Sequence, residues 1–233
     1  MSGVHEPVPD LARDPFAVPD LATLRKEYGD AGLDEADVAA DPWEQWQRWY
    51  GDAAAAGLHE PNAMIVATVD PDGTPSVRTV LLKGVATERP DDGFRFFTNT
   101  ASRKGRALAA EPQCALLFPW HPLERQVRVE GTATPLPTAE VEAYFAVRPR
   151  GSQLGAWASP QSRPVAGREE LEQAYAEAEE RFTGTDVPVP PTWGGYRVQP
   201  TSFEFWQGRP GRLHDRISYT RTSTGWEITR LAP

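Results

Sequence analysis

The sequence predicts a mainly β protein, an antiparallel barrel that is closed or nearly closed, with helices inserted between its strands. Short apolar, β-branched segments recur along the chain, and turn sequences such as Asp70-Pro71-Asp72-Gly73 separate them. Most of the connections are short enough for hairpins. A chain of 233 residues has an ordinary length for one such barrel, and 39% hydrophobic residues are enough for a core. We therefore predict a tail over residues 1–20 and one domain over residues 21–233.

The charge and the composition exclude several classes of protein. The net charge of −9 argues against a general affinity for nucleic acid or for an anionic membrane. No apolar run is long enough to span a membrane, and the N-terminus lacks the apolar core of a secretion signal, so we predict a soluble, cytoplasmic protein. The single cysteine, Cys114, forms no intrachain disulfide and lies in an apolar run, which predicts a buried, inert thiol.

The helices are predicted from their caps and from their periodicity. Asp41 and Pro42 are typical of an N-cap and a first helical position, and Gly57 would end the helix. Tryptophans at three-residue spacing within it predict a face packed on the core. Ser102 is a second N-cap candidate, for a helix that ends at Glu111-Pro112. The other predicted helices cover residues 21–28, 138–147 and 169–182, of which the last is strongly charged and would form a solvated surface.

Strands are predicted where polar and apolar residues alternate or where apolar runs are short. They cover residues 63–70, 76–84, 94–98, 113–120, 123–134, 195–199, 202–207, 212–220 and 225–231. Residues 148–152 are predicted as a turn and residues 155–164 as a loop. Strict alternation would place Arg78 and Lys83 on opposite faces of their strand, so that either the strand bends or the two cations meet different ligands.

Basic side chains recur at strand ends, turns and helix starts. The four clusters are Arg78/Lys83, Arg103/Lys104, Arg148/Ser152 and Arg212/Arg216. Cations in the first helical turn are unfavourable unless an anion accompanies them, so Arg103 and Lys104 indicate a phosphate at the start of their helix. For Arg78 and Lys83 the alternative is that they extend from an edge into solvent, and for residues 202–216 it is an exposed polar hairpin end. Together the clusters could hold two phosphorylated small molecules.

The motifs for other chemistry are absent. The chain has no phosphate-binding GxxxxGK[ST] loop and no strand–GxGxxG–helix fingerprint. It also lacks a HExxH or CxxC metal motif and a GxSxG nucleophile elbow, and we predict no metal site. With neither a nucleophile nor a metal in evidence, the difficult chemistry would belong to a bound cofactor.

Several long motifs, in order, resemble the pyridoxine/pyridoxamine 5′-phosphate oxidase family. They are RTVLLKG (78–84), FFTN (96–99), SRKGR (102–106), LERQVRVEG (123–131), YFAVRPRGSQLGAWASPQS (144–162), WGGYRV (193–198), EFWQGRPGRLHDR (204–216) and RLAP (230–233). The resemblance implies a split β-barrel that binds FMN, and a homodimer with its active sites between the protomers. It also implies oxidation of pyridoxine or pyridoxamine 5′-phosphate at C4′ to pyridoxal 5′-phosphate, with O2 reduced to hydrogen peroxide.

The resemblance also implies roles for individual residues. For FMN the implied residues are Arg78, Thr79, Val80, Leu81, Leu82, Lys83, Phe97, Thr98, Arg103, Lys104, Gln126, Gln161, Ser162, Trp206 and Arg216. For the substrate they are Arg25, Lys26, Glu27, Tyr28, Lys83, Tyr144, Arg148, Ser152, Arg212, Leu213 and His214. Arg212 and His214 are the implied catalytic residues. They would orient the ring and stabilise charge as a hydride passes from C4′ to flavin N5. Residues 25–28 would close over the substrate.

Two other functions remain open from the sequence. One is a sister flavin oxidase of the same fold that acts on another ring, such as a phenazine precursor. The other is a protein that binds FMN or pyridoxal phosphate without catalysis. The sequence departs from the family at Lys26, where an arginine is common, and over residues 86–93, which look like a lengthened hairpin loop.

Overall fold

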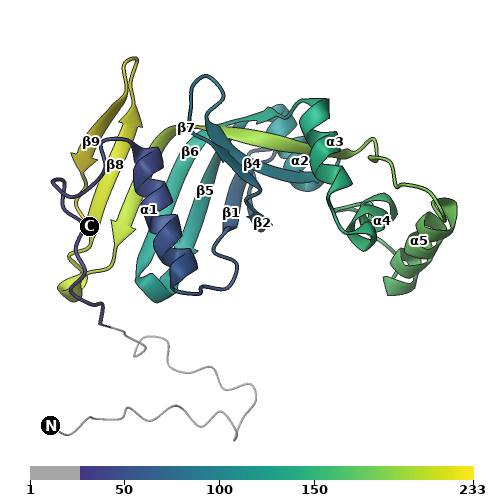
Figure 1. Cartoon of the computed structure of the whole chain (residues 1–233), viewed down its shortest axis with the longest axis horizontal. Coiled ribbons are helices and arrows are strands. Elements are labelled where there is room, and N and C mark those ends of the chain that lie inside the picture. The colour runs from purple at the N-terminus through teal and green to yellow at the C-terminus, as the bar shows by residue number, and fades with distance from the viewer. Residues whose placement is uncertain (1–26) are drawn as a thin grey trace, which may run out of the picture.

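Nine strands form one curled antiparallel sheet in the computed structural model, which describes residues 27–233 (Figure 1). The strands are β1 (Ala63–Val69), β2 (Pro75–Leu81), β3 (Gly84–Ala86), β4 (Gly93–Asn99), β5 (Gln113–Trp120), β6 (Arg125–Pro135), β7 (Trp193–Gln207), β8 (Asp215–Arg221) and β9 (Trp226–Arg230). The helices are α1 (Pro42–Ala55), α2 (Arg103–Ala110), α3 (Thr138–Ala146), α4 (Arg150–Ala158) and α5 (Arg168–Arg181), with 3₁₀ turns at His121–Leu123 and Pro210–Arg212.

The long strand β7 joins the two ends of the sheet. The strand order is β2-β1-β5-β6-β7-β4-β3, with β8 paired to β7 and β9 to β8. β7 pairs with β6 along most of its length, with β4 along its first part and with β8 along its last part. The sheet therefore curls into a half-barrel with open edges, which confirms the mainly antiparallel, split-barrel class.

The prediction of two strands over 195–199 and 202–207 was wrong, because β7 continues through Pro200. A proline lacks the N–H that a ladder needs, and it is tolerated in a sheet at a bulge. The β6–β7 register shifts between Glu130 and Gly131, opposite this position. A Cβ on Gly131 would lie 2.3 Å from the Gln199 carbonyl oxygen, so the bulge needs glycine there.

Other predicted segments also differ from the structure. The predicted turn at 148–152 and loop at 155–164 give way to α4, which covers Arg150–Ala158. Its glycines lower the helix propensity, but Leu154 packs into a buried cluster and stabilises the helix. The strands predicted from 123 and 212 begin only at Arg125 and Asp215, after 3₁₀ turns. Of the helix predicted over 21–28, residues 27 and 28 are not helical, and the rest lies outside the described residues, as does the predicted tail.

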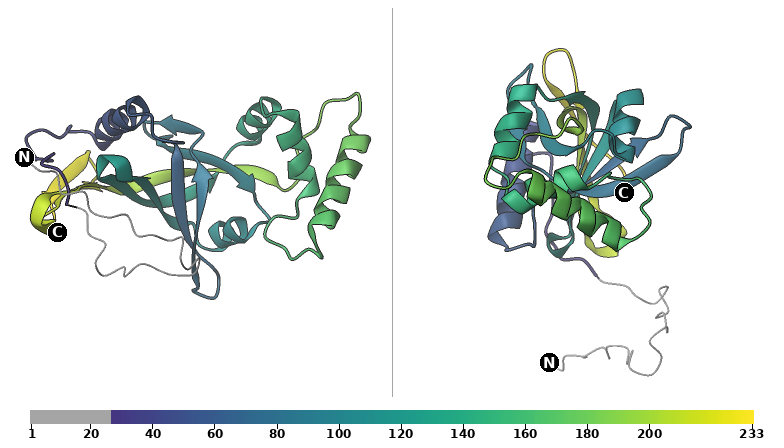
Figure 2. Two further views of the ribbon diagram at one scale, coloured as in Figure 1. Left: turned by 90° about the horizontal axis from the view of Figure 1, so that it is seen from below. Right: turned by 90° about the vertical axis from the view of Figure 1, so that its right-hand side faces the viewer.

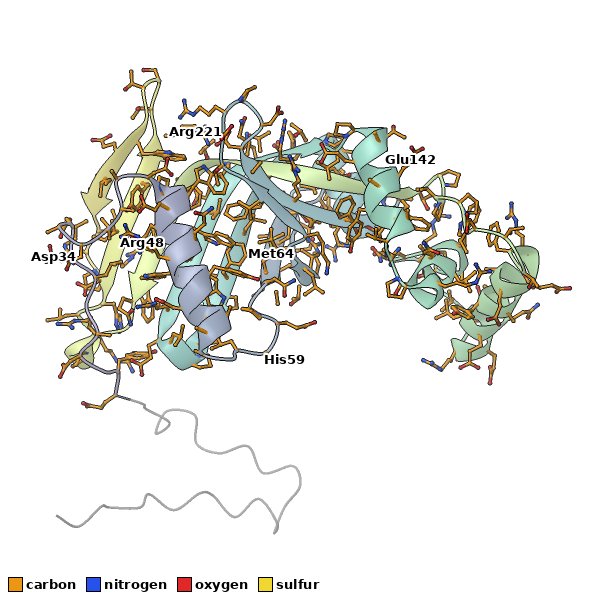
Figure 3. The ribbon with its side chains drawn as sticks, viewed as in Figure 1. Asp34, Arg48, His59, Met64, Glu142 and Arg221 are labelled. Atoms are coloured by element: carbon orange, nitrogen blue, oxygen red, sulfur yellow. The ribbon has the colours of Figure 1, made fainter. Side chains whose placement is uncertain are left out.

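The helix α1 begins and packs as predicted. The Asp41 carboxylate accepts the Trp43 backbone N–H at 2.7 Å. Trp43, Trp46 and Trp49 are buried, and their rings meet sheet phenylalanines such as Phe203, 5.1 Å from Trp43 between ring centroids. Met64, fully buried in the same cluster, is labelled in Figure 3. The tryptophan stripe is therefore part of the core that holds α1 on the sheet.

The helices α3, α4 and α5 project from the end of the sheet opposite to the β8–β9 hairpin (Figures 1 and 2). They enclose a second buried cluster that includes Phe145, Leu154 and Phe182. Most of α5 is exposed, as its charge predicts, while Ala178 faces this cluster. Cys114 packs against the main core, and burial raises the pKa of its thiol to about 12, so it is protonated at neutral pH. No helix within residues 27–233 is long and apolar enough to cross a membrane.

We expect Phe203→Ala to destabilise the protein by about 3–5 kcal/mol, because it leaves a cavity under α1. Phe203 is fully buried and contacts the rings of Trp43, Phe94 and Trp226. Chemical denaturation measures the change. The control is Val69→Ala, at a strand end where the side chain is 39% exposed, with an expected loss below about 1 kcal/mol. Equal losses for both variants would contradict the assignment of the core.

Candidate active site

A buried lysine lies at the start of α2. The Ser102 hydroxyl caps the helix by accepting the Gly105 N–H at 3.3 Å. Lys104 Nζ donates to Thr98 Oγ1 at 2.9 Å and to Gln161 Oε1 at 2.8 Å. A Cβ on Gly105 would lie 2.1 Å from the Thr100 carbonyl oxygen, so glycine allows the helix to begin this close to β4. The ammonium group is thus held by neutral oxygens beside free helix N–H groups.

The electrostatics of this helix start favour an anion. Lys104 is 9% exposed, and no carboxylate of residues 27–233 forms an ion pair with it. Burial, with a contribution from Arg78, lowers the pKa of Lys104 to about 8. Among the described residues 27–233, the Arg78 guanidinium donates to neutral oxygens, those of Val66, Thr68 and Ser76, and has no carboxylate partner. Within this part of the chain, two cations without a carboxylate partner therefore converge beside a helix N-terminus, an arrangement suited to a phosphate.

Arg103 has a different role from Lys104. Its guanidinium pairs with the Asp70 carboxylate, at 2.6 Å from Nη2, and remains 48% exposed. Asp70 lies in the turn between β1 and β2, so the ion pair attaches this turn to α2. One of the two cations that the sequence placed in the first helical turn therefore has its anion within the protein.

Two stacked aromatic rings and an arginine lie beside α3. Phe97 of β4 stacks on Tyr144 of α3, with ring centroids 3.8 Å apart. Arg148 lies just after α3, with its guanidinium 4.0 Å from the centre of the Trp193 ring. Its Nη1 is buried without a hydrogen-bond partner, and burial lowers the pKa of the guanidinium. Arg148 is thus a desolvated cation with an unused donor, which is favourable for binding an anion.

Three more predicted residues lie side by side at the C-terminal end of β7. In the sheet register Gln126 of β6 is opposite Trp206 of β7, and Trp206 is opposite Arg216 of β8. Arg216 donates twice to the buried Glu204 carboxylate, at 2.9 and 3.1 Å, and once to the Ala232 carbonyl oxygen at 2.8 Å. The Glu204 hydrogen bonds raise the pKa of Arg216. The arginine is therefore rigid before any ligand arrives.

His214 and Tyr28 complete this second group. The Tyr28 ring meets His214 edge-on, with centroids 5.3 Å apart, and Trp206 at 5.8 Å. The backbone N–H of Arg209 donates to His214 Nδ1 at 3.1 Å. In the neutral imidazole this bond assigns the proton to Nε2. His214 therefore presents a donor on the side away from the Arg209 amide.

The predicted residues thus form two sets at opposite ends of β7. The helix-side set comprises Arg78, Phe97, Thr98, Arg103, Lys104, Tyr144, Arg148, Ser152, Gln161 and Ser162. The hairpin-side set comprises Tyr28, Gln126, Trp206, Arg212, Leu213, His214 and Arg216. β7 has 15 residues, and a strand rises about 3.3 Å per residue, so roughly 45 Å of strand separates its ends. One protomer does not bring the two sets to one small ligand.

Several predicted residues have side chains that are exposed to solvent. Lys83, Ser152, Ser162 and Arg212 are exposed, and Leu213 is 73% exposed. Lys83 lies after the end of β2, so the alternation expected to place it opposite Arg78 does not extend to it. Residues 79–82 line the end of β2, of which Leu82 is buried. Glu27 is exposed, and Arg25 and Lys26 lie outside the described residues.

Sequence reasoning missed the residues that hold these sets in place. Asp70, Trp193, Glu204 and Asp215 each contact a predicted site residue or its neighbour. Nothing in the local sequence marks Asp70 as a partner, since its pair with Arg103 forms between segments distant along the chain. Trp193, Glu204 and Asp215 lie inside the quoted motifs, which was the one available signal. No cluster of three potential metal-ligating side chains occurs in residues 27–233.

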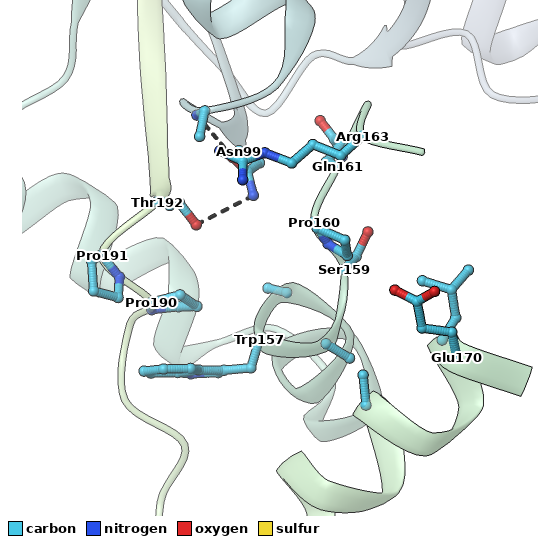
Figure 4. A pocket seen from close by; sticks show the side chains of 15 residues that line it. Asn99, Trp157, Ser159, Pro160, Gln161, Arg163, Glu170, Pro190, Pro191 and Thr192 are labelled. Carbon is cyan, nitrogen blue, oxygen red and sulfur yellow. Dashed lines mark hydrogen bonds between the residues drawn. The ribbon is translucent and has the colours of Figure 1, made fainter. Parts of the chain in front are cut away.

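A cavity of about 420 Å³ adjoins the helix-side set (Figure 4). Its walls include Trp157, Pro190 and Gln161, and the Asn99 amide on its rim donates to Thr192 Oγ1 at 3.2 Å. Gln161 is also the acceptor for Lys104, so the cavity opens beside the buried lysine. The cavity is mostly apolar and lies on the side of α4 and α5, next to the cation cluster and not at its centre.

The fold and these two sets define a split-barrel oxidoreductase. A family model described as pyridoxamine 5′-phosphate oxidase matches residues 50–182, and one described as pyridoxine 5′-phosphate oxidase C-terminal dimerisation region matches residues 193–233. The chain belongs to the pyridoxine/pyridoxamine 5′-phosphate oxidase family, and it is an enzyme. The predicted family is therefore confirmed, and the chain carries the family's dimerisation region.

Named relatives agree with this assignment. A pyridoxine/pyridoxamine 5′-phosphate oxidase from Nocardioides sp. is 64% identical over 92% of this chain and 98% of the relative. One from Rubrobacter xylanophilus is 58% identical over 92% of this chain and 97% of the relative. Among solved structures, PhzG from Burkholderia lata in complex with tetrahydrophenazine-1-carboxylic acid has a TM-score of 0.81 and 30% identity, over 89% of this chain and 100% of that chain.

We expect Lys104→Met to change how stability depends on pH. The pKa of Lys104 is about 8 in the folded chain, below the 10.5 of a free lysine. Between these values the unfolded chain binds more protons, so folding stability from this residue rises as the pH rises from about 8 to 10.5. Chemical denaturation across this range should show the wild type gaining stability relative to the Met variant. Parallel pH profiles of the two proteins would contradict a desolvated lysine.

Proposed function

We propose that the protein is an FMN-dependent oxidase that converts pyridoxine and pyridoxamine 5′-phosphate to pyridoxal 5′-phosphate. The observation that carries the proposal is the pair Arg78 and Lys104, two cations with neutral partners at the start of α2. A phosphate monoester carries a charge of about −1.5 to −2 and offers three strong acceptor oxygens. Such a group would supply the missing anion, raise the pKa of Lys104 and so favour its charged form, and bond to the free N–H groups of the helix.

The residues fit FMN as well as a bare phosphate. Thr98 and Gln161 both bond to Lys104 and, with Arg103 in the first turn of α2, would hold the phosphate and ribityl chain, with Ser162 next to Gln161. Phe97 and residues 79–83 would border the flavin. Gln126, Trp206 and Arg216, aligned across three strands, would close the flavin site from the hairpin-side set. The Glu204 carboxylate, already bonded to Arg216, would keep that guanidinium in one orientation.

The substrate phosphate would bind to Tyr144, Arg148 and Ser152, with Lys83 between the two ligands. Arg148 supports this role because its Nη1 is buried and unpaired. Ser152 lies in the first turn of α4, and its exposed hydroxyl would be the donor, since its backbone N–H is already bonded to the Pro149 carbonyl oxygen. Arg212, Leu213 and His214 would contact the pyridine ring, and Glu27 and Tyr28, with Arg25 and Lys26, would cover it.

The chemistry that FMN supplies is acceptance of a hydride and transfer of the two electrons to O2, which leaves as hydrogen peroxide. The chain's own residues bind and orient. Arg212 and His214 would fix the ring so that C4′ faces the flavin, and the Nε2–H of His214 would stabilise negative charge on a ring substituent. The alcohol substrate would lose a hydride from C4′ and a proton from its oxygen, which gives the aldehyde directly. The amine substrate would lose a hydride from C4′ and a proton from its nitrogen, and water would hydrolyse the resulting imine to the aldehyde and ammonia.

A homodimer would bring the two sets together. The distance along β7 keeps the helix-side and hairpin-side sets apart within one protomer, and residues 193–233 match a dimerisation region. In a symmetric dimer each helix-side set would face the hairpin-side set of the other copy, which gives two equivalent sites. The conclusion that each site needs both copies rests on this separation and on the family.

The second candidate is oxidation of a phenazine precursor, because the PhzG structure has the same fold at 30% identity. Identity of 58–64% to the pyridoxine/pyridoxamine 5′-phosphate oxidases favours the vitamin B6 phosphates. Arg148 and Ser152 also favour a phosphorylated substrate. A carrier that binds the ligands without turnover is the remaining alternative.

The proposed reaction predicts that the purified, yellow FMN-loaded protein bleaches when pyridoxine phosphate is added without oxygen. Colour should return on admission of air, with hydrogen peroxide formed in proportion to the product. Absorbance in the flavin band follows both steps. Unphosphorylated pyridoxine serves as the matched control and should bleach the protein far more slowly. Bleaching by tetrahydrophenazine-1-carboxylic acid alone would favour the second candidate, and no bleaching would favour a carrier.

The dimer model predicts complementation between two inactive variants. Arg148→Ala alters the helix-side set and Arg212→Ala the hairpin-side set, so each homodimer should be nearly inactive. In a mixed dimer one site carries both changes and the other carries neither, so random pairing should restore about a quarter of wild-type activity. The two variants are co-expressed with different tags, and activity is measured on the doubly purified and unfractionated protein. Activity no greater than the mean of the two variants would mean that each site lies within one protomer.

A further inference from the structure

Asp215 connects three parts of the chain directly behind His214. Its Oδ2 accepts the Leu33 backbone N–H at 3.0 Å, and its Oδ1 accepts from Arg230 Nη1 at 2.6 Å. Arg209 Nε lies 3.5 Å from the same carboxylate. The side chain of Asp215 is 18% exposed and Leu33 is buried, so these contacts are largely shielded from water. One carboxylate thus attaches the N-terminal segment and β9 to the turn that carries His214.

The segment 28–35 has further contacts with the same region. The Gly29 N–H donates to Glu124 Oε2 at 2.8 Å. Arg230 Nη2 donates to the Leu33 carbonyl oxygen at 3.0 Å and pairs with Glu35 at 2.5 Å. Asp34, labelled in Figure 3, lies beside the β8–β9 hairpin, 4.0 Å from the same guanidinium. The segment is therefore attached along its length by backbone and charged contacts, and none of these uses a residue of the proposed ligand sites.

Gly208 provides the surface on which Tyr28 rests. A Cβ at this position would lie 2.7 Å from Tyr28 Cδ1 and 2.9 Å from Cγ, and real side chains essentially never approach so closely. The Gly208 N–H donates to the Glu124 carbonyl oxygen at 2.7 Å, which fixes the backbone under the ring. Only glycine at 208 lets the Tyr28 ring lie where it meets Trp206 and His214.

The backbone next to Gly208 also orients His214. Arg209 follows Gly208 directly; its amide donates to His214 Nδ1 and its guanidinium to the Asp30 carbonyl oxygen. Tyr28 and His214 are consequently set by one small group of backbone and carboxylate contacts. A shift of Asp215 or Gly208 would move the tyrosine wall relative to the imidazole.

We propose that Asp215 and Gly208 are positioning residues that set Tyr28 against His214 and so shape the wall of the substrate site. This inference rests on the proposed function for its catalytic consequence, although the docking of the segment is independent of it. Neither residue touches substrate or FMN; Asp215 acts through Leu33 and the attached segment, and Gly208 acts through the Tyr28 ring.

The first test is Asp215→Ala in the full-length, FMN-loaded protein. Loss of a charge-assisted hydrogen bond should lower the hydrogen-exchange protection of the segment 28–35 by about tenfold or more. The KM for pyridoxine phosphate should rise at least about fivefold, because a binding wall is lost, while kcat changes by less than about twofold. FMN affinity should remain within about twofold. Asp215→Asn, which keeps an acceptor for Leu33, should recover part of the protection.

The second test is a double-mutant cycle between Gly208 and Tyr28. Gly208→Ala should raise KM in the wild-type background, because the new methyl group displaces the Tyr28 ring. In the Tyr28→Ala background the same change should have little further effect, since the ring it displaces is already absent. The matched control is Gly51→Ala, on the exposed face of α1 with no atom within 4 Å of the new Cβ, and it should leave KM unchanged.

The outcomes separate the positioning role from the proposed reaction. Unchanged exchange of residues 28–35 in Asp215→Ala would overturn the positioning role, as would increased exchange with unchanged KM. Independent, additive effects of Gly208→Ala and Tyr28→Ala on KM would overturn the role of Gly208. If the wild type oxidises no vitamin B6 phosphate, the proposed function fails, while the exchange measurement still decides whether Asp215 holds the segment.

Discussion

The length of β7 is the constraint on which the rest of the structure depends. Its 15 residues pair with β6, β4 and β8, and it runs unbroken through Pro200 because Thr201 forms a bulge opposite Glu130 and Gly131 of β6. This single strand supports α2 and α3 near its beginning and His214 and Arg216 near its end. In the proposed dimer, symmetry would complete a ligand-binding surface that is divided in this way, and dimer formation would then have a direct chemical role.

The cationic side chains at the two ends of the sheet differ in their partners. At α2 the protein keeps Lys104 and Arg78 without carboxylates, at a cost in stability that an anionic ligand would offset. At the hairpin end the arginines already have partners: Arg216 has Glu204, and Arg230 has Glu35 and Asp215. The first end is suited to bind an anion. At the second end the ion pairs hold the arginines in place, and aromatic rings and oriented donors lie beside them.

The sequence predicted the features that depend on local patterns. The cap at Asp41, the tryptophan face of α1, the start of α2 at Ser102 and most strands were recovered, because alternation, caps and turn residues act over a few positions. The α4 helix and the continuity of β7 were missed because tertiary packing overrides local propensity at Gly155 and Pro200. The site residues came from the family resemblance. The partners Asp70, Glu204 and Asp215, and the division of the site into two sets, depend on pairings between distant segments.

The hydrogen bond from Arg216 to the Ala232 carbonyl oxygen attaches residues 231 and 232 to β8. The Leu231 N–H also donates to the Arg216 carbonyl oxygen at 2.9 Å, so this segment is held by one side-chain and one backbone hydrogen bond. The same guanidinium is bonded to Glu204 of β7. Proteolytic removal of residues 231–233 would therefore leave Arg216 Nη1 without this acceptor, beside the strand that carries Trp206.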